Sequence, residues 1–271
     1  MDDILLTKLC IPPLRTEGVP RPLLIERIKQ NLSGALTLLA APPGYGKTSL
    51  LTAWAMHHPE SVAWISLDEG DNDLARLLAY LIAALQRLQP DIGGSALAML
   101  RSPKSLKTET ILVPLLNDIS TFDQDLFLVL DDYHVISDPQ IHQVFSYILD
   151  HIPARMHVLI ASRSDPPMPL ARLRGRGKLL ELRAEDLKFS TEETRDFLVK
   201  TFGLRISEED LNSLYLRTED GSRGCKWLRS VSGIMRIQPC SFEILQVTIA
   251  LSWIIWWKKC YRISRRKSVI S

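Results

Sequence analysis

The octapeptide APPGYGKT, residues 41–48, decides the fold of this 271-residue chain. It follows the apolar run ALTLLA (35–40) and precedes the helix-forming stretch SLLTAWAM (49–56). A strand, a glycine-rich turn, Lys-Thr and a helix are the parts of a phosphate-binding loop, where backbone N–H groups converge on phosphate oxygens. Ala41 stands where the usual G-x-x-x-x-G-K-[ST] motif has its first glycine. The order of the elements still predicts a nucleotide site, and an ordinary strand-to-helix turn is the alternative.

The residue types of this loop match the chemistry of phosphate and Mg²⁺ binding. Gly44 and Gly46 keep the turn permissive where backbone must approach a ligand. Lys47 supplies a mobile positive charge, and the Thr48 hydroxyl can complete a Mg²⁺ shell. The predicted nucleotide-binding residues of the loop are Pro43, Gly44, Tyr45, Gly46, Lys47, Thr48 and Ser49.

A second acidic element lies downstream in DLFLVLDDYH, residues 125–134. The apolar residues 126–130 are typical of a buried parallel strand, and Asp131 and Asp132 end it. Carboxylates at the carboxyl end of such a strand lie beside a phosphate-binding loop. We expect Asp131 to serve the Mg²⁺ side, directly or through water, and Asp132 to orient or deprotonate a water. A helix cap or turn is the alternative for such a pair.

A third strand, HVLIASR, ends in Arg163 at the same predicted edge. Its guanidinium is expected near the γ-phosphate, where charge-assisted hydrogen bonds would distinguish ATP from ADP. Arg172, Arg174 and Arg176 compete for this role, and a solvated loop arginine is the alternative.

Strands and helices alternate along the first 200 residues, which predicts a parallel sheet. Further strands are expected at 61–67 and 178–183, and helices at 73–88, 108–120 and 139–152. The predicted class is therefore α/β, a P-loop NTPase with a parallel sheet flanked by helices and followed by the start of a helical domain. The expected organisation is a lead-in segment (1–30), a P-loop NTPase domain (31–185), the start of a helical domain (186–220) and a tail (221–271), with 93–105 as a mobile connection.

Charge divides the chain in two. Residues 1–220 have a net charge of −7, and residues 221–271 have +9 together with three of the four cysteines. The apolar run 244–257 has 14 residues, fewer than the roughly 20 that span a bilayer, so no membrane contact is expected. The cysteines lack metal-ligand spacing. MDDILLTKLC has acidic residues where a signal peptide is positive, which predicts a cytoplasmic protein.

Several segments together resemble the start of large LuxR-type transcriptional regulators of the maltose-activator (MalT) kind, which are signal-transduction (STAND) ATPases. The resemblance extends over about residues 5–219 and rests on these stretches in order: VPRPLLIERI, LLAAPPGYGKTSLLTAW, VAWISLDEGDNDLARLLAYLIAAL, LFLVLDDYHVI, VLIASRSDPPMPLARLRGRGKLLELRAEDLKFS and LYLRTED.

This resemblance implies an ATP/ADP switch with Mg²⁺, at most a slow ATPase. A bound inducer would permit ATP-dependent self-association of the full-length regulator, and DNA would be bound only through a distant helix-turn-helix domain. The family's nucleotide residues correspond to Lys47, Thr48, Asp131, Asp132 and Arg163. The segment RPLLIER, which contains Arg21, resembles the part of such regulators that packs near the base of the nucleotide.

Residues 221–271 resemble a translation in the wrong reading frame. Codons displaced by two bases permit LDYLVEEVL in place of WIIWWKKCY, and WVAGLQMAAV near 220–230, which are stretches that the family resemblance implies. A one-base deletion near the codons for Glu219 and Asp220 explains both, and predicts a regulator module cut short, with a tail that has no evolved function. A stand-alone P-loop ATPase and a membrane-anchored one are the alternatives.

Overall fold

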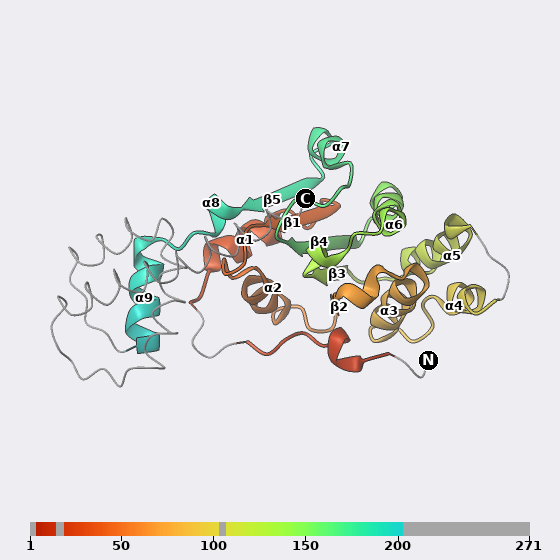
Figure 1. Cartoon of the computed structure of the whole chain (residues 1–271), viewed down its shortest axis with the longest axis horizontal. Coiled ribbons are helices and arrows are strands. Elements are labelled where there is room, and N and C mark those ends of the chain that lie inside the picture. The colour runs from red at the N-terminus through yellow and green to blue at the C-terminus, as the bar shows by residue number, and fades with distance from the viewer. Residues whose placement is uncertain (1–3, 15–18, 103–106, 203–271) are drawn as a thin grey trace, which may run out of the picture. The chain divides into compact units, whose positions relative to one another are not determined.

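The computed structural model describes residues 4–14, 19–102 and 107–202 (Figure 1). The chain divides into two compact units, Met1–Cys225 and Lys226–Ser271, and all described residues belong to the first. The expectations for the frame-shifted tail, and for the helical domain beyond residue 202, concern residues outside these ranges and stay predictions.

A five-stranded, entirely parallel sheet forms the centre of the described part, which confirms the predicted α/β class. Its order is β2-β3-β4-β1-β5. Because β4 lies between β1 and β3, the carboxyl ends of these three strands are neighbours at one edge of the sheet. The strands are β1 (Leu36–Ala40), β2 (Val62–Ser66), β3 (Leu126–Asp131), β4 (Met156–Ser162) and β5 (Leu179–Arg183).

Helices cover both faces of this sheet (Figure 1). The structure also contains short 3₁₀ helices: η1 (Leu6–Leu9) precedes α1, η2 (Glu69–Asn72) follows β2, and η3 (Tyr133–Val135) follows β3. The α-helices are α1 (Pro22–Gln30), α2 (Lys47–Ala55), α3 (Leu74–Gln86), α4 (Gly94–Leu100), α5 (Thr108–Ser120), α6 (Pro139–Asp150), α7 (Leu170–Gly175), α8 (Ala184–Leu187) and α9 (Thr191–Phe202).

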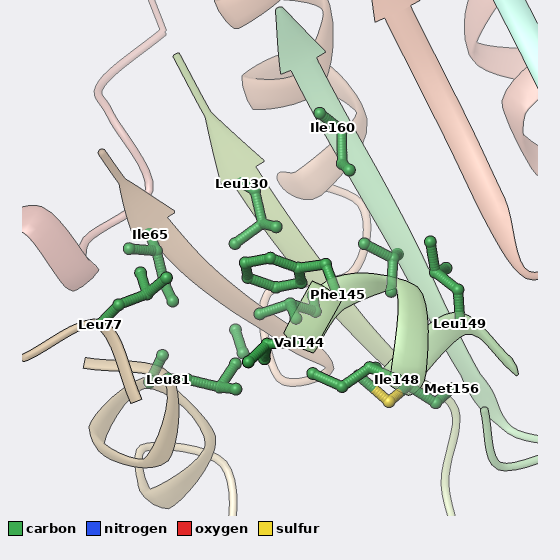
Figure 2. Close-up of a cluster of buried hydrophobic side chains, with 14 of the residues drawn as sticks. Ile65, Leu77, Leu81, Leu130, Val144, Phe145, Ile148, Leu149, Met156 and Ile160 are labelled. Atoms are coloured by element: carbon green, nitrogen blue, oxygen red, sulfur yellow. The ribbon is translucent and has the colours of Figure 1, made fainter. Parts of the chain in front are cut away.

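The larger core lies between one face of the sheet and helices α3–α6. Figure 2 shows Phe145 of α6 near Leu130 of β3, and Leu77 of α3 near Ile65 of β2. Strand residues alternate between the two faces, as the period of two requires. This layer fixes β3, and with it the position of the acidic pair at its end.

The smaller core holds the helix that follows the phosphate-binding loop. Trp54 of α2 is fully buried and meets Phe127 of β3 edge-on, with ring centroids 5.0 Å apart. Ile28 of α1 and Leu51 of α2 belong to the same cluster. Edge-to-face aromatic pairs contribute beyond their buried area. The helix is therefore held against both β3 and α1.

The expected connection at 93–105 is partly wrong, because residues 94–100 form helix α4. Gly93 precedes it with a φ of 74°, and its N–H donates to Asp118 Oδ2 at 2.9 Å. A Cβ at Gly93 would lie only 2.9 Å from Ile82 Cγ2. Packing against α3 and α5 thus forms a short helix that the local pattern did not predict.

The lead-in segment is attached to the edge of the sheet by a buried ion pair. Lys8 of η1 pairs with the fully buried Asp71 of η2 and lies over the Tyr80 ring at 4.6 Å. The N–H of Leu5 also donates to the Tyr80 hydroxyl at 3.1 Å. Removing one partner of a buried pair is strongly destabilising, so this contact holds η1 in place. Within the described ranges, no helix has both the length and the apolar character needed to cross a bilayer.

Candidate nucleotide-binding site

The phosphate-binding loop connects the end of β1 to the start of α2. Gly44 and Gly46 have φ values of 105° and 76°, in the region that favours glycine. No heavy atom lies within 4 Å of the position that a Cβ on Gly46 would take. The loop therefore exposes backbone next to open space, at the N-terminus of a nine-residue helix. This is the cradle that a phosphate group requires.

Lys47 folds back onto the loop that carries it. Its ammonium donates to the carbonyl oxygens of Ala41 at 2.6 Å and Pro42 at 3.1 Å, and the residue is largely buried. The N–H of Ala41 in turn donates to Ser162 O, the last residue of β4, at 3.2 Å. The positive charge is thus held at the edge of the sheet where β1 and β4 end.

Thr48 and Asp131 are brought together across the intervening strand β4. The Thr48 hydroxyl donates to Asp131 Oδ1 at 3.0 Å, and Asp131 is only 4% exposed. Burial, together with the neighbouring charge of Asp132, raises the pKa of Asp131 from 3.8 to about 6. The hydrogen bonds from the Thr48 hydroxyl and the Asp132 N–H, and the charge of Lys47, act in the opposite direction.

This pair fits a Mg²⁺ ion. A hydroxyl and a carboxylate are hard oxygen ligands, and Mg²⁺ commonly takes one or two protein oxygens and completes its shell with water and phosphate. A cation next to the buried Asp131 would also stabilise its ionised form, which burial disfavours. The structure thus joins the two predicted metal residues, Thr48 and Asp131.

Asp132 differs from Asp131 in conformation and exposure. Its φ of 58° makes it the one non-glycine residue with a positive φ in the part of the chain that the structure describes. Its side chain is 54% exposed, and Oδ1 lies 3.7 Å from His134 Nδ1. The left-handed turn after β3 therefore separates the two carboxylates, one buried beside Thr48 and one open to solvent. Such backbone strain is frequent at functional sites.

Arg163 follows the last residue of β4 and is exposed. Burial is the main cause that lowers the pKa of His134; the charges of Arg163 and Lys47 lower it further, whereas the charge of Asp132 raises it. Two competing arginines are engaged elsewhere, Arg172 with Asp150 and Arg174 with Glu181 at 2.9 Å. The structure thus brings Arg163 to the edge that holds Lys47 and Asp132.

Arg21 lies against the turn between α8 and α9. The largely buried guanidinium donates to the carbonyl oxygens of Leu187 at 2.8 Å and Lys188 at 2.7 Å, and to Glu193 at 3.2 Å. It also lies 5.2 Å from the centre of the Phe189 ring. Sequence reasoning placed Arg21 near the base and did not foresee these contacts. The nucleotide role of Arg21 stays a prediction.

Substituting Arg21 with alanine tests which role dominates. The change leaves two carbonyl groups and Glu193 without this partner, so we expect a loss of about 1–3 kcal/mol in the free energy of unfolding. Urea unfolding and ADP affinity are both measured. The control is Arg27→Ala, since the exposed Arg27–Asp186 pair, at 2.8 Å, should contribute less than about 1 kcal/mol. A loss of ADP affinity at unchanged stability would instead favour the role near the base.

His134 is a residue of this edge that sequence reasoning missed. It stands inside the DLFLVLDDYH run, three residues after Asp131. A polar residue so soon after a strand-end carboxylate is a signal for the same edge of the sheet. Its contacts, however, depend on the left-handed turn at Asp132. The periodicity of apolar residues in the sequence does not indicate that turn.

MalT regulators of several bacteria are similar to this chain, whereas no protein-family model matches it. The HTH-type transcriptional regulator MalT of Cronobacter sakazakii is 37% identical over 187 residues, which are 68% of this chain and 20% of the relative. The MalT of Klebsiella pneumoniae is 34% identical over 204 residues (74% and 21%), and that of Vibrio parahaemolyticus 32% over 208 residues (77% and 23%). The chain spans about a fifth of the length of these curated relatives.

Among solved structures, a RuvB variant of Thermotoga maritima is similar with a TM-score of 0.51. The match covers 89% of this chain and 72% of that chain at 14% identity. At this identity the likeness supports the fold alone, in agreement with the parallel sheet and the phosphate-binding loop.

Proposed function

Because this chain is a MalT-like protein with a P-loop NTPase fold, we propose that it is the ATP/ADP-binding switch module of a LuxR-type transcriptional regulator. Self-association and DNA binding would belong to the whole regulator. Residues 1–220 have a net charge of −7, which does not favour contact with DNA phosphates. Contact with DNA would then come from a separate helix-turn-helix domain of that regulator.

One observation carries the proposal, namely the hydrogen bond of 3.0 Å between Thr48 and Asp131 beside an open glycine loop. The two residues lie 83 positions apart in sequence, Thr48 in the first turn of α2 and Asp131 at the end of β3. A turn with a purely structural role needs neither a buried carboxylate nor loop backbone that faces open space beside it. A buried carboxylate is costly to ionise, and the Lys47 charge only partly offsets the burial of Asp131, so a bound cation would stabilise its ionised form.

Each residue has a distinct part in binding. The backbone N–H groups at Gly44–Thr48 would receive the phosphates, and Lys47 would exchange its carbonyl partners for phosphate oxygens. Thr48 and Asp131 would hold Mg²⁺, which supplies charge neutralisation between the phosphates when bound. Asp132 would orient the attacking water, and Arg163 would contact the γ-phosphate. As in other switches, turnover would be slow enough for the ATP state to persist.

Calorimetric titration of the full chain with ATP and with ADP, each with and without Mg²⁺, tests the proposal. We expect both nucleotides to bind, and Mg²⁺ to strengthen the binding of ATP. If the chain bound neither nucleotide, the proposed switch function would be wrong, whereas the similarity to MalT would be unaffected.

The buried Asp131 should make the metal-free protein less stable at high pH. Its folded pKa of about 6 exceeds the ordinary 3.8, so the stabilising effect of its protonation is complete below 3.8 and is lost as the pH rises through 6. We expect Asp131→Asn to raise the free energy of unfolding at pH 8 by about 1–3 kcal/mol, and to change it little at pH 4.

Urea unfolding at both pH values measures this effect. The control is Asp132→Asn, because the side chain of Asp132 is 54% exposed and its neutralisation should leave stability nearly unchanged. An Asp131→Asn variant that is less stable than the parent at pH 8 would show that the ionised carboxylate stabilises the fold. The same variant should show weaker Mg²⁺ dependence of ATP binding.

A further inference from the structure

The His134 ring at this site has a nitrogen without a hydrogen-bond partner. Its side chain is 15% exposed, yet Nδ1 is buried and makes no hydrogen bond within the ranges that the structure describes. A buried polar atom that lacks a partner costs on the order of 1–3 kcal/mol. Such an atom calls for a specific explanation. One explanation is that a partner moves within hydrogen-bond distance only when a ligand binds.

The backbone around His134 is anchored on both sides. The Tyr133 hydroxyl shares a buried hydrogen bond of 2.9 Å with His142 Nδ1 on α6. On the other side, Asn72 Nδ2 donates to Val135 O at 3.0 Å, and Asn72 Oδ1 accepts from Ser137 N at 2.7 Å. These contacts attach η3 to α6 and to η2, so the backbone that carries the His134 ring is held in place.

The carboxylate of Asp132 lies close to this ring, on a side chain that is mostly exposed. Asp132 Oδ1 lies 3.7 Å from His134 Nδ1, which is longer than a hydrogen bond, and the Asp132 side chain is mostly exposed. A movement of less than about 1 Å would make the bond, and catalytic hydrogen bonds often tighten only in the complex with substrate. The strained backbone of Asp132 holds the carboxylate within that reach.

We propose that His134 is a positioning residue for Asp132: its Nδ1–H donates a hydrogen bond to the Asp132 carboxylate and holds it toward the attacking water. The inference rests on the proposed nucleotide function and adds a residue to it. Burial lowers the pKa of His134, and the charges of Arg163 and Lys47 act in the same direction against that of Asp132, so the neutral ring, with a single proton to place on Nδ1, is favoured.

Single-turnover ATP hydrolysis by the full chain tests this role, because it registers slow rates. We expect His134→Ala to lower the rate about 10- to 100-fold, with ADP affinity changed less than about twofold. His134→Asn, whose amide can donate from near the Nδ1 position, should recover part of the rate. The control is His151→Ala, since exposed His151 lies at the end of α6 and bonds Tyr147 O.

A double-mutant cycle distinguishes action through Asp132 from an independent effect. In an Asp132→Asn background, His134→Ala should cause no further loss of rate. A readout besides activity is the ring ¹⁵N spectrum of His134: with ADP, Mg²⁺ and aluminium fluoride, Nδ1 should become the protonated nitrogen in a hydrogen bond.

Each failure identifies a different error. A chain that binds no nucleotide overturns the proposed function together with this inference. A chain that binds nucleotide overturns the inference alone if it shows no turnover, if His134→Ala has no effect, if the two losses multiply independently, or if the ring spectrum does not change.

Discussion

Lys47→Ala is expected to lower the affinity of the chain for ATP with Mg²⁺ at least tenfold. The ammonium lies within the phosphate-binding loop, where its hydrogen bonds to Ala41 O and Pro42 O hold it at the edge of the sheet. A charge-assisted contact to a phosphate oxygen contributes on the order of 1.5–3 kcal/mol, and about 1.4 kcal/mol corresponds to a factor of ten.

Titration calorimetry with the parent chain and the variant measures this loss. Thermal unfolding is recorded alongside, because the mutation also removes two intraloop hydrogen bonds. Lys29→Ala serves as the control, since Lys29 is exposed in the last turn of α1 and should leave ATP affinity unchanged. A folded Lys47→Ala variant with the affinity of the parent would remove the loop from the nucleotide site.

Much of the site could be predicted because its signals are local. The phosphate-binding loop is a continuous motif between an apolar strand and a helix, and the acidic pair ends another apolar strand. The carboxyl ends of parallel strands meet at one edge, so the approach of Thr48 to Asp131 follows once both strands are assigned.

The rest depends on contacts between distant residues. Periodicity indicates which strand residues are buried but not which strand is the neighbour, so the order β2-β3-β4-β1-β5 could not be derived from it. The contact of Arg21 with Leu187 joins residues 166 positions apart, and that of Asn72 with Val135 joins residues 63 apart. No residue type at either end indicates the other.

The position of α1 shows how such contacts bear on function. Leu24 and Ile28 of α1 share a core cluster with Leu50 of α2, the helix that begins at Lys47. At its start, α1 is preceded by Arg21, whose guanidinium binds the turn before α9. Packing thus connects the phosphate-binding helix to the segment that leads out of the sheet. A chain of packed side chains of this kind can carry energetic coupling between two sites.

Asp132→Asn is expected to retain nucleotide and to lose most hydrolysis, about 100-fold or more. The amide keeps the size of the side chain but cannot accept a proton or orient a water as a carboxylate does. Binding should persist, because the Asp132 side chain is mostly exposed and does not share the hydrogen bond between Thr48 and Asp131. Single-turnover hydrolysis and ADP affinity are measured on the same preparation.

Asp131→Asn is the matched comparison, since it changes the adjacent carboxylate by the same atoms. Its buried position beside Thr48 predicts a weaker dependence of ATP binding on Mg²⁺, whereas Asp132→Asn should leave that dependence intact. The left-handed turn at Asp132 is the physical reason for the difference, because it directs one carboxylate into the protein and the other to solvent. If both substitutions impaired binding and turnover equally, the two carboxylates would act as one unit, and the separate roles drawn from this turn would be wrong.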